Sequence, residues 1–119
     1  MSIKILKKND KNILKLKKAE NGVEYFSFEA LEKYTELING FSTRIGGISE
    51  GPYDSMNLSF SREPDNKEGV LENYKRMAKA LGVKEDSFVL SYQEHSTNVR
   101  VVNKSDMGKG VSVERDYRN

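Results

Sequence analysis

The sequence predicts an α/β protein of the α+β kind, and three patterns in its 119 residues lead to this fold class. Two strand-like runs near the N-terminus are joined by Asn21-Gly22, which is typical of a β-hairpin. Apolar residues then recur at helical spacing over residues 70–81. Two further β-rich runs follow, at residues 88–92 and 98–102. Strands therefore stand on both sides of one long helix.

The elements before the helix are predicted in order along the chain. Apolar and charged residues alternate over residues 13–17, and residues 23–28 are rich in aromatic and other strand-forming side chains, so these runs form the two arms of the hairpin. A short helical stretch is expected at residues 29–34. A strand over residues 37–43 would then end directly before Arg44.

The helix has start and stop signals as well as periodicity. The carboxylate of Asp65 is expected to cap its N-terminus, with Glu68 three residues later, and Gly82 ends the apolar repeat. Tyr74 and Met77 stand on the apolar stripe, and we expect them to belong to the core rather than to contact a cofactor.

Composition excludes several classes of protein. The net charge of +2 is too balanced for a nucleic-acid binder, and the lysines of the first 18 residues are expected to form a solvated strand edge. The sequence contains no cysteine, no apolar run long enough for a membrane span and no secretory signal, so we expect a cytoplasmic protein without a membrane partner. With 36% hydrophobic and 32% charged residues, part of the core is expected to come from another piece of chain.

A candidate anion site lies in residues 41–58. Glycine pairs allow positive φ and can turn successive N–H groups toward one point, and Gly46-Gly47 follows closely after Arg44, whose planar guanidinium suits phosphate or carboxylate. The alternative is a tight turn with a solvated arginine.

His95, the single histidine of the sequence, is a candidate metal ligand. A histidine beside a strand is more often hydrogen-bonded than metal-bound, but His95 can serve as a metal ligand. Zinc needs three or four donors, and Glu94 or Asp106 could add only oxygen atoms. If His95 binds a metal, its partner ligands lie elsewhere.

Four segments together resemble the YfiH-like proteins, described both as laccase-like multicopper polyphenol oxidoreductases and as zinc-dependent purine nucleoside phosphorylases. FSTRIGGIS at 41–49 is similar to the family's F-[ST]-T-R-x-G-G-[VI]-S, and GPYDSMNL at 51–58 to its G-P-[YF]-x-S-[LM]-N-L. VLENY at 70–74 and QEH at 93–95 are similar to V-x-x-N-R and Q-[VT]-H. The resemblance is strongest over residues 39–102.

The resemblance implies a four-layer α/β/β/α sandwich with a mixed sheet. Residues 1–119 look like a single N-terminal portion of that domain, with 104–119 as a flexible loop and the C-terminal half absent. The family's metal is held by the Q-x-H histidine, here His95, together with the cysteine of an A-D-C motif and the histidine of an H-x-G-W motif. This chain has neither of the last two, so alone it is expected to be inactive. Two partners fit this expectation: the C-terminal half of the same protein as a separate fragment, and a second copy of the chain.

The activity implied for the complete family member is phosphorolysis of adenosine- and inosine-type nucleosides, with adenosine deamination as a further reaction. Arg44, with the Gly46 and Gly47 backbone, would bind phosphate, and Asn57 would hydrogen-bond the substrate or the loop itself. Arg44 and His95 would be the catalytic residues, with His95 holding zinc. Copper-dependent phenol oxidation and a non-enzymatic interaction fragment are the alternatives.

This sequence departs from the family pattern at three places. Tyr74 replaces the arginine that follows the helix asparagine, Glu94 replaces a small apolar residue, and residues 62–66 replace an acidic G-D-D-P-like turn. The resemblance therefore does not extend to the substrate contacts of that arginine.

Overall fold

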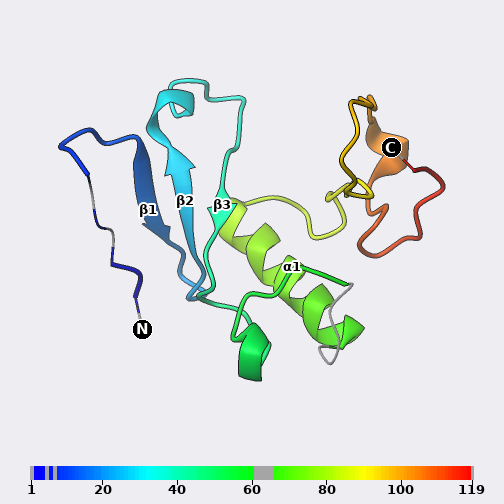
Figure 1. Ribbon diagram of the computed structural model, residues 1–119, viewed down its shortest axis with the longest axis horizontal. Coiled ribbons are helices and arrows are strands. Elements are labelled where there is room, and N and C mark those ends of the chain that lie inside the picture. Colours follow the sequence, from blue (N-terminus) through cyan, green and yellow to red (C-terminus); the bar gives the residue numbers. More distant parts are fainter. Residues whose placement is uncertain (1, 5, 7, 61–65, 119) are drawn as a thin grey trace. The chain divides into compact units, whose positions relative to one another are not determined.

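The structure is a computed structural model that describes residues 2–4, 6, 8–60 and 66–118. The chain forms two compact units, Met1–Gly82 and Val83–Asn119. The first unit contains a small antiparallel sheet and one α-helix, so its mixed α/β character agrees with the prediction (Figure 1). Its elements are β1 (Leu14–Lys18), β2 (Glu24–Phe28), the 3-10 helix η1 (Glu29–Leu31), β3 (Phe41–Ser42), the 3-10 helix η2 (Gly51–Tyr53) and α1 (Lys67–Leu81).

The predicted hairpin is confirmed. β1 and β2 pair antiparallel, and Gly22 takes the positive φ of +86° that the turn between them requires. The sheet order is β1-β2-β3, which places the lysine-rich β1 at an edge. The strand predicted over residues 37–43 is much shorter than expected, because only Phe41 and Ser42 pair with β2.

The helix prediction is confirmed at its C-terminus and corrected at its N-terminus. α1 ends at Gly82, which adopts the left-handed conformation with φ of +72°. At its start, the Asn66 side chain accepts a hydrogen bond from the Gly69 N–H. The cap expected at Asp65 is therefore wrong by one residue, and Asp65 itself lies outside the described residues. An amide oxygen caps the helix in place of a carboxylate.

The core of the first unit lies where α1 meets the loops and one face of the sheet. Its buried apolar side chains are Val23, Met56, Val70, Tyr74, Met77 and Ala78. The Tyr74 hydroxyl donates to the Leu58 carbonyl oxygen (2.7 Å), and burial raises the pKa of this hydroxyl above its usual value. The core role predicted for Tyr74 and Met77 is confirmed.

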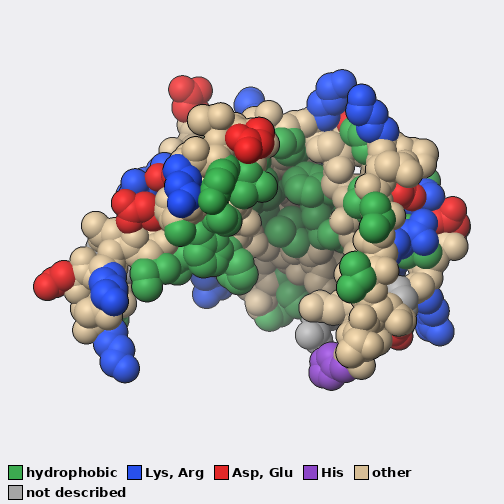
Figure 2. All heavy atoms as spheres, turned by 90° about the horizontal axis from the view of Figure 1, so that it is seen from above, with side chains coloured by type: hydrophobic (Ala, Val, Ile, Leu, Met, Phe, Trp, Pro, Cys, Tyr) green, Lys and Arg blue, Asp and Glu red, His purple; other side chains and the backbone are tan. Residues whose placement is uncertain are grey.

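The other face of the sheet is apolar and open. Side chains alternate between faces along a strand, and the register pairs Leu14 with Phe28 and Phe26 with both Leu16 and Phe41. These five residues therefore share one face, which we call the open sheet face. Phe41 is 66% exposed, and Leu14 and Phe28 are also exposed. Figure 2 shows hydrophobic side chains at the molecular surface.

The helix lies on the opposite face. Tyr25 alternates with these five residues along the sheet, and its ring and the Leu81 side chain of α1 both lie beside Gly40. Lys17, Tyr25, Lys79 and Ala80 also line one shallow pocket. On this same face Glu32 accepts hydrogen bonds from Lys15 and Ser27, and Lys17 forms an ion pair with it. Together these three partners lower the pKa of the Glu32 carboxyl group to about 2.

The second unit contains the 3-10 helix η3 (Lys104–Asp106), and the strands predicted in it are wrong. Residues 88–92 and 98–102 form no strand in the structure. Gly108 N donates to the Phe88 carbonyl oxygen (2.8 Å) and Leu90 N to the Lys109 carbonyl oxygen (2.9 Å), but these two bonds do not make residues 88–92 a strand. Val99 and Val101 are 93% and 89% exposed. A strand-forming sequence needs a neighbouring strand, and this unit supplies none for residues 98–102.

No helix among the described residues is long and apolar enough to cross a membrane.

Candidate functional site

The candidate site is the loop of residues 44–58, which we call the Arg44 loop. Its two arms are held together at Ser55 and at the Arg44 backbone. The Arg44 carbonyl oxygen accepts hydrogen bonds from Ser55 N, Met56 N and Ser55 Oγ (3.0, 3.0 and 2.8 Å). Ser49 N donates to the Ser55 carbonyl oxygen (2.9 Å), and Gly47 N donates to Ser55 Oγ (3.1 Å). The loop is therefore closed by its own backbone rather than left as an open turn.

Close backbone packing requires both glycines of the predicted pair. Gly46 has a φ of +101°, and a Cβ on it would lie 2.7 Å from the Gly22 carbonyl oxygen and against the Val23 backbone. A Cβ on Gly47 would overlap the Ser55 carbonyl oxygen and lie 2.6 Å from the Met56 Cα. Any side chain at either position would push the arms of the loop apart.

The guanidinium of Arg44 is held in place from one side. Its Nε and Nη2 donate to the Asp54 carbonyl oxygen at 3.0 and 2.6 Å, and the residue is exposed. A guanidinium has five N–H donors, so this bidentate contact fixes the orientation of the fork and leaves donors for an anion. Arg44 is thus oriented before any ligand binds.

Most backbone N–H groups beside Arg44 already have partners. Ile45 N donates to Thr43 Oγ1 (3.2 Å) and Ile48 N to Asn73 Oδ1 (2.8 Å), while the Gly47 and Ser49 amides donate to Ser55. Among the described residues, none accepts a hydrogen bond from Gly46 N. The loop therefore keeps at least one backbone donor, two residues along the chain from Arg44, that an anion can use.

Asn57 lies in the second arm of the loop. Its Oδ1 accepts a hydrogen bond from Ser59 N (3.0 Å), and its carbonyl oxygen accepts one from Asn73 Nδ2 (2.8 Å). These bonds join Asn57 to Ser59, directly after the loop, and to α1.

A cleft of about 740 Å³ adjoins the Arg44 loop, between η2 and the start of α1. Its lining residues are Ile48, Ser49, Glu50, Gly51, Pro52, Tyr53, Asn66, Glu68 and Gly69. The size lies within the range of small-molecule sites. The carboxylates of Glu50 and Glu68 disfavour an anion in this cleft, so the cleft suits an uncharged group.

His95 belongs to the second unit, whereas Arg44, Gly46, Gly47 and Asn57 all belong to the first. His95 is exposed at a bend, where Ser96 N donates to the Glu94 carbonyl oxygen (2.9 Å). The structure brings the four predicted phosphate-loop residues together in one loop.

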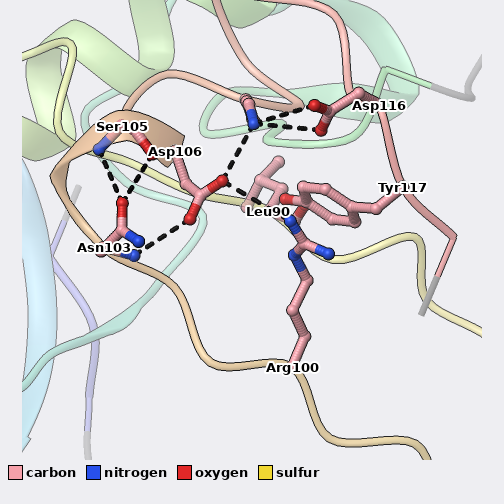
Figure 3. A network of polar contacts seen from close by, with 8 residues as sticks. Leu90, Arg100, Asn103, Ser105, Asp106, Asp116 and Tyr117 are labelled. Carbon is pink, nitrogen blue, oxygen red and sulfur yellow. Dashed lines mark hydrogen bonds and ion pairs between the residues drawn. The ribbon is translucent and has the colours of Figure 1, made fainter.

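Asp106, considered as an oxygen ligand, has a structural role (Figure 3). It is 4% exposed, and its carboxylate accepts hydrogen bonds from Asn103 N (3.0 Å) and Lys109 Nζ (2.9 Å). The backbone N–H of Asn103 and the ammonium of Lys109 lower the pKa of Asp106. Lys109 also bridges to Asp116, and Arg100 lies over the Tyr117 ring. Both carboxylate oxygens therefore already have partners.

The residues present do not fit a complete metal centre. The sequence has one histidine and no cysteine, and the described residues contain no group of three or more histidine, cysteine or carboxylate side chains that could hold a metal ion. Zinc and copper sites in proteins need several such donors. This chain can contribute at most a single histidine ligand.

Sequence reasoning missed Asn73, which turns out to contact both arms of the loop. The sequence does contain a signal for this role. Asn73 lies three residues after Val70 and four before Met77, so it is a polar residue within the apolar stripe of the helix. A polar side chain on a buried helix face must find hydrogen-bond partners.

Comparison with known proteins places this site in a family. A family model described as "multi-copper polyphenol oxidoreductase laccase" matches residues 38–116, which include the whole Arg44 loop, Asn73 and His95. The chain therefore belongs to this family, whose members include the YfiH-like proteins.

The relatives found by sequence carry a more specific name. The chain is 33% identical over 82 residues to purine nucleoside phosphorylase YlmD of Bacillus subtilis, a match that covers 69% of this chain and 28% of the relative. A purine nucleoside phosphorylase of Corynebacterium glutamicum is 37% identical over 74 residues, covering 62% of this chain and 29% of the relative. A purine nucleoside phosphorylase of Deinococcus radiodurans is 41% identical over 61 residues, covering 51% of this chain and 23% of the relative. The chain thus spans less than a third of the length of these relatives. No solved structure gives a significant match.

Proposed function

We propose that this chain supplies the phosphate-binding part of a purine nucleoside phosphorylase that acts on adenosine- and inosine-type nucleosides. The observation that carries the proposal is the Arg44 loop, which holds a pre-oriented guanidinium and, two residues further along the chain, the Gly46 N–H, for which no described residue is an acceptor. Three relatives named purine nucleoside phosphorylase support the choice of substrates. Adenosine deamination is a second reaction under the same proposal.

Each loop residue has a role in phosphorolysis. In this reaction a phosphate oxygen attacks C1′ of the ribose, the bond from C1′ to the purine nitrogen breaks, and the base leaves with its electron pair and takes up a proton. Arg44 and the Gly46 N–H hold the attacking phosphate and balance its charge. Gly47 shapes the loop, and Asn57 keeps its second arm in place. The adjoining cleft has room for the nucleoside.

His95 is the ligand that this chain offers to a metal, which we take to be zinc. When bound, zinc acts as a Lewis acid and lowers the pKa of a water ligand. Its other ligands, a cysteine and a second histidine, would come from polypeptide beyond these 119 residues. Under this proposal the chain alone is inactive.

The open sheet face supports the corresponding proposal about the fold. We take residues 1–119 to be one N-terminal portion of a four-layer α/β/β/α sandwich with a mixed sheet, acting in the cytoplasm. In a sandwich two sheets pack face to face through their apolar sides, and Leu14, Phe28 and Phe41 offer such a side. The second sheet would be the remaining polypeptide, either in one chain or as a companion fragment.

Copper-dependent phenol oxidation has less support. Met56 and Met77 are buried in the core, so they are not available as the soft ligands that copper prefers.

A hybrid enzyme tests the proposed function. Residues 38–116 would replace the matched segment of the Bacillus subtilis relative, and release of hypoxanthine and ribose 1-phosphate from inosine would be measured with and without phosphate. We expect phosphate-dependent release that Arg44→Ala lowers by about 100-fold or more, in line with the loss of one transition-state contact. The matched control Arg115→Ala should leave it unchanged. A cooperatively unfolding hybrid that is inactive, or that is insensitive to Arg44→Ala, would overturn the proposal.

A further inference from the structure

Asn73 makes an unusual set of contacts for a helix residue. Its side chain is 0% exposed. Its Oδ1 accepts a hydrogen bond from Ile48 N (2.8 Å), and its Nδ2 donates to Ser49 Oγ (2.9 Å) and to the Asn57 carbonyl oxygen (2.8 Å). One amide group therefore joins the first arm of the Arg44 loop to the second arm.

Two other residues of α1 also bond to the loop. Tyr74 donates to the Leu58 carbonyl oxygen in the second arm, and Arg76 Nη1 donates to the Gly46 carbonyl oxygen in the first arm (3.3 Å). Among the described residues, Asn73 is the helix side chain that bonds to both arms. The Arg44 guanidinium is held by the Asp54 carbonyl oxygen of the second arm, whereas Gly46 lies in the first arm. Their relative position therefore depends on this amide together with the bonds at Ser55.

We infer that Asn73 is the positioning residue of the phosphate site, an inference that rests on the proposed function. Only an amide meets the requirement, which is one acceptor and two donors within a single short side chain. Aspartate would keep the acceptor and lose both donors, and leucine would match the volume but leave Ile48 N–H, Ser49 and the Asn57 carbonyl oxygen without these partners. Asn73 does not touch the phosphate.

Phosphate affinity distinguishes positioning from general support of the fold. The 119-residue chain would be titrated with inorganic phosphate as wild type, Asn73→Ala and the control Tyr74→Phe, which removes a neighbouring buried hydrogen bond to one arm only. We expect Asn73→Ala to raise the dissociation constant at least 10-fold and Tyr74→Phe to change it less than 2-fold. Equal effects of the two substitutions, or an effect of Asn73→Ala below 2-fold, would overturn the inference.

A second readout does not depend on phosphate. Hydrogen exchange of the Ile48 amide should be at least 10-fold faster in Asn73→Ala than in Tyr74→Phe, because only the first variant removes its acceptor. If wild type binds no phosphate, the proposed function fails, and this exchange ratio decides whether Asn73 orders the loop. A ratio near one would reject that role.

A third measurement covers the case in which Asn73→Ala does not fold. In the wild-type chain the two Nδ2 protons of Asn73 should exchange with water at least 10-fold more slowly than those of an asparagine in an unstructured peptide. Exchange as fast as in the peptide would show that the amide does not hold the two arms, and the inference would fail.

Discussion

Replacing Gly47 by alanine should destabilise the first unit through a steric conflict inside the Arg44 loop. The added Cβ would overlap the Ser55 carbonyl oxygen and approach the Met56 Cα to 2.6 Å. Both contacts are with backbone atoms, so no side-chain rotation can relieve them. The second arm must therefore move away from the first.

The cost follows from the hydrogen bonds that such a movement breaks. Of the bonds that join the arms at Ser55, the two next to the steric conflict come from Gly47 N and Ser49 N. Each contributes about 1 kcal/mol net, and a buried donor left without a partner costs about 1–3 kcal/mol. We therefore expect Gly47→Ala to lower the free energy of unfolding by about 2–4 kcal/mol.

Gly51 provides the matched control in the same loop. It has a φ of +62°, but a Cβ on it would meet nothing within 4 Å. Gly51→Ala should therefore cost only the left-handed conformation, about 1–2 kcal/mol.

Urea unfolding followed by circular dichroism would measure both variants. With an m-value of about 2 kcal/mol/M, the midpoint for Gly47→Ala should fall by roughly 1–2 M, and by less for Gly51→Ala. Failure of Gly47→Ala to fold while Gly51→Ala folds would also agree with the steric reasoning. A Gly47→Ala chain as stable as Gly51→Ala would refute it.

Three further predictions follow from the contacts. Tyr74→Phe should lower the free energy of unfolding by about 1 kcal/mol, measured by urea unfolding, because it removes the bond to the Leu58 carbonyl oxygen. The Glu32 carboxylate should titrate near pH 2 by NMR; since its folded pKa is lowered from 4.5, its stabilising effect is present above pH 4.5 and is lost as the pH falls toward 2, and Glu32→Gln should remove that part of the acid sensitivity. Asp106→Asn should speed amide exchange in the second unit, because the ion pair with Lys109 is lost, whereas unchanged exchange there would contradict the role given to Asp106.

Local signals predicted the first unit well. The hairpin followed from alternation and from Asn21-Gly22, and the helix end followed from Gly82, since both glycines take the positive φ that these positions require. The N-cap was displaced by one residue because Asp65 and Asn66 are both good capping residues, and sequence alone does not choose between them.

The second unit was predicted less well because its structure depends on distant partners. Val99 and Val101 have high strand propensity, but a strand forms only where another strand accepts its hydrogen bonds. The same limit applies to residues 37–40, where the chain approaches β2 and pairs only from Phe41 onward.

The residues of the candidate site were predicted, but not all the reasons for their positions. Arg44, Gly46 and Gly47 lie together as expected, yet the glycines are required by packing against Val23 and Ser55 as much as by turn geometry. Such close backbone approaches join residues far apart in the sequence, and no local pattern reveals them.

Titration of the 119-residue chain with inorganic phosphate, followed through its amide and guanidinium NMR signals, is the most direct test of phosphate binding by the Arg44 loop. We expect saturable shifts of the Gly46 amide and of the Arg44 Nη protons, because Nε–H already donates to the Asp54 carbonyl oxygen. These shifts should vanish in Arg44→Ala and persist in the control Arg118→Ala, whose arginine lies in the second unit. An absence of saturable shifts in the wild type, or shifts that survive in Arg44→Ala, would contradict the claim.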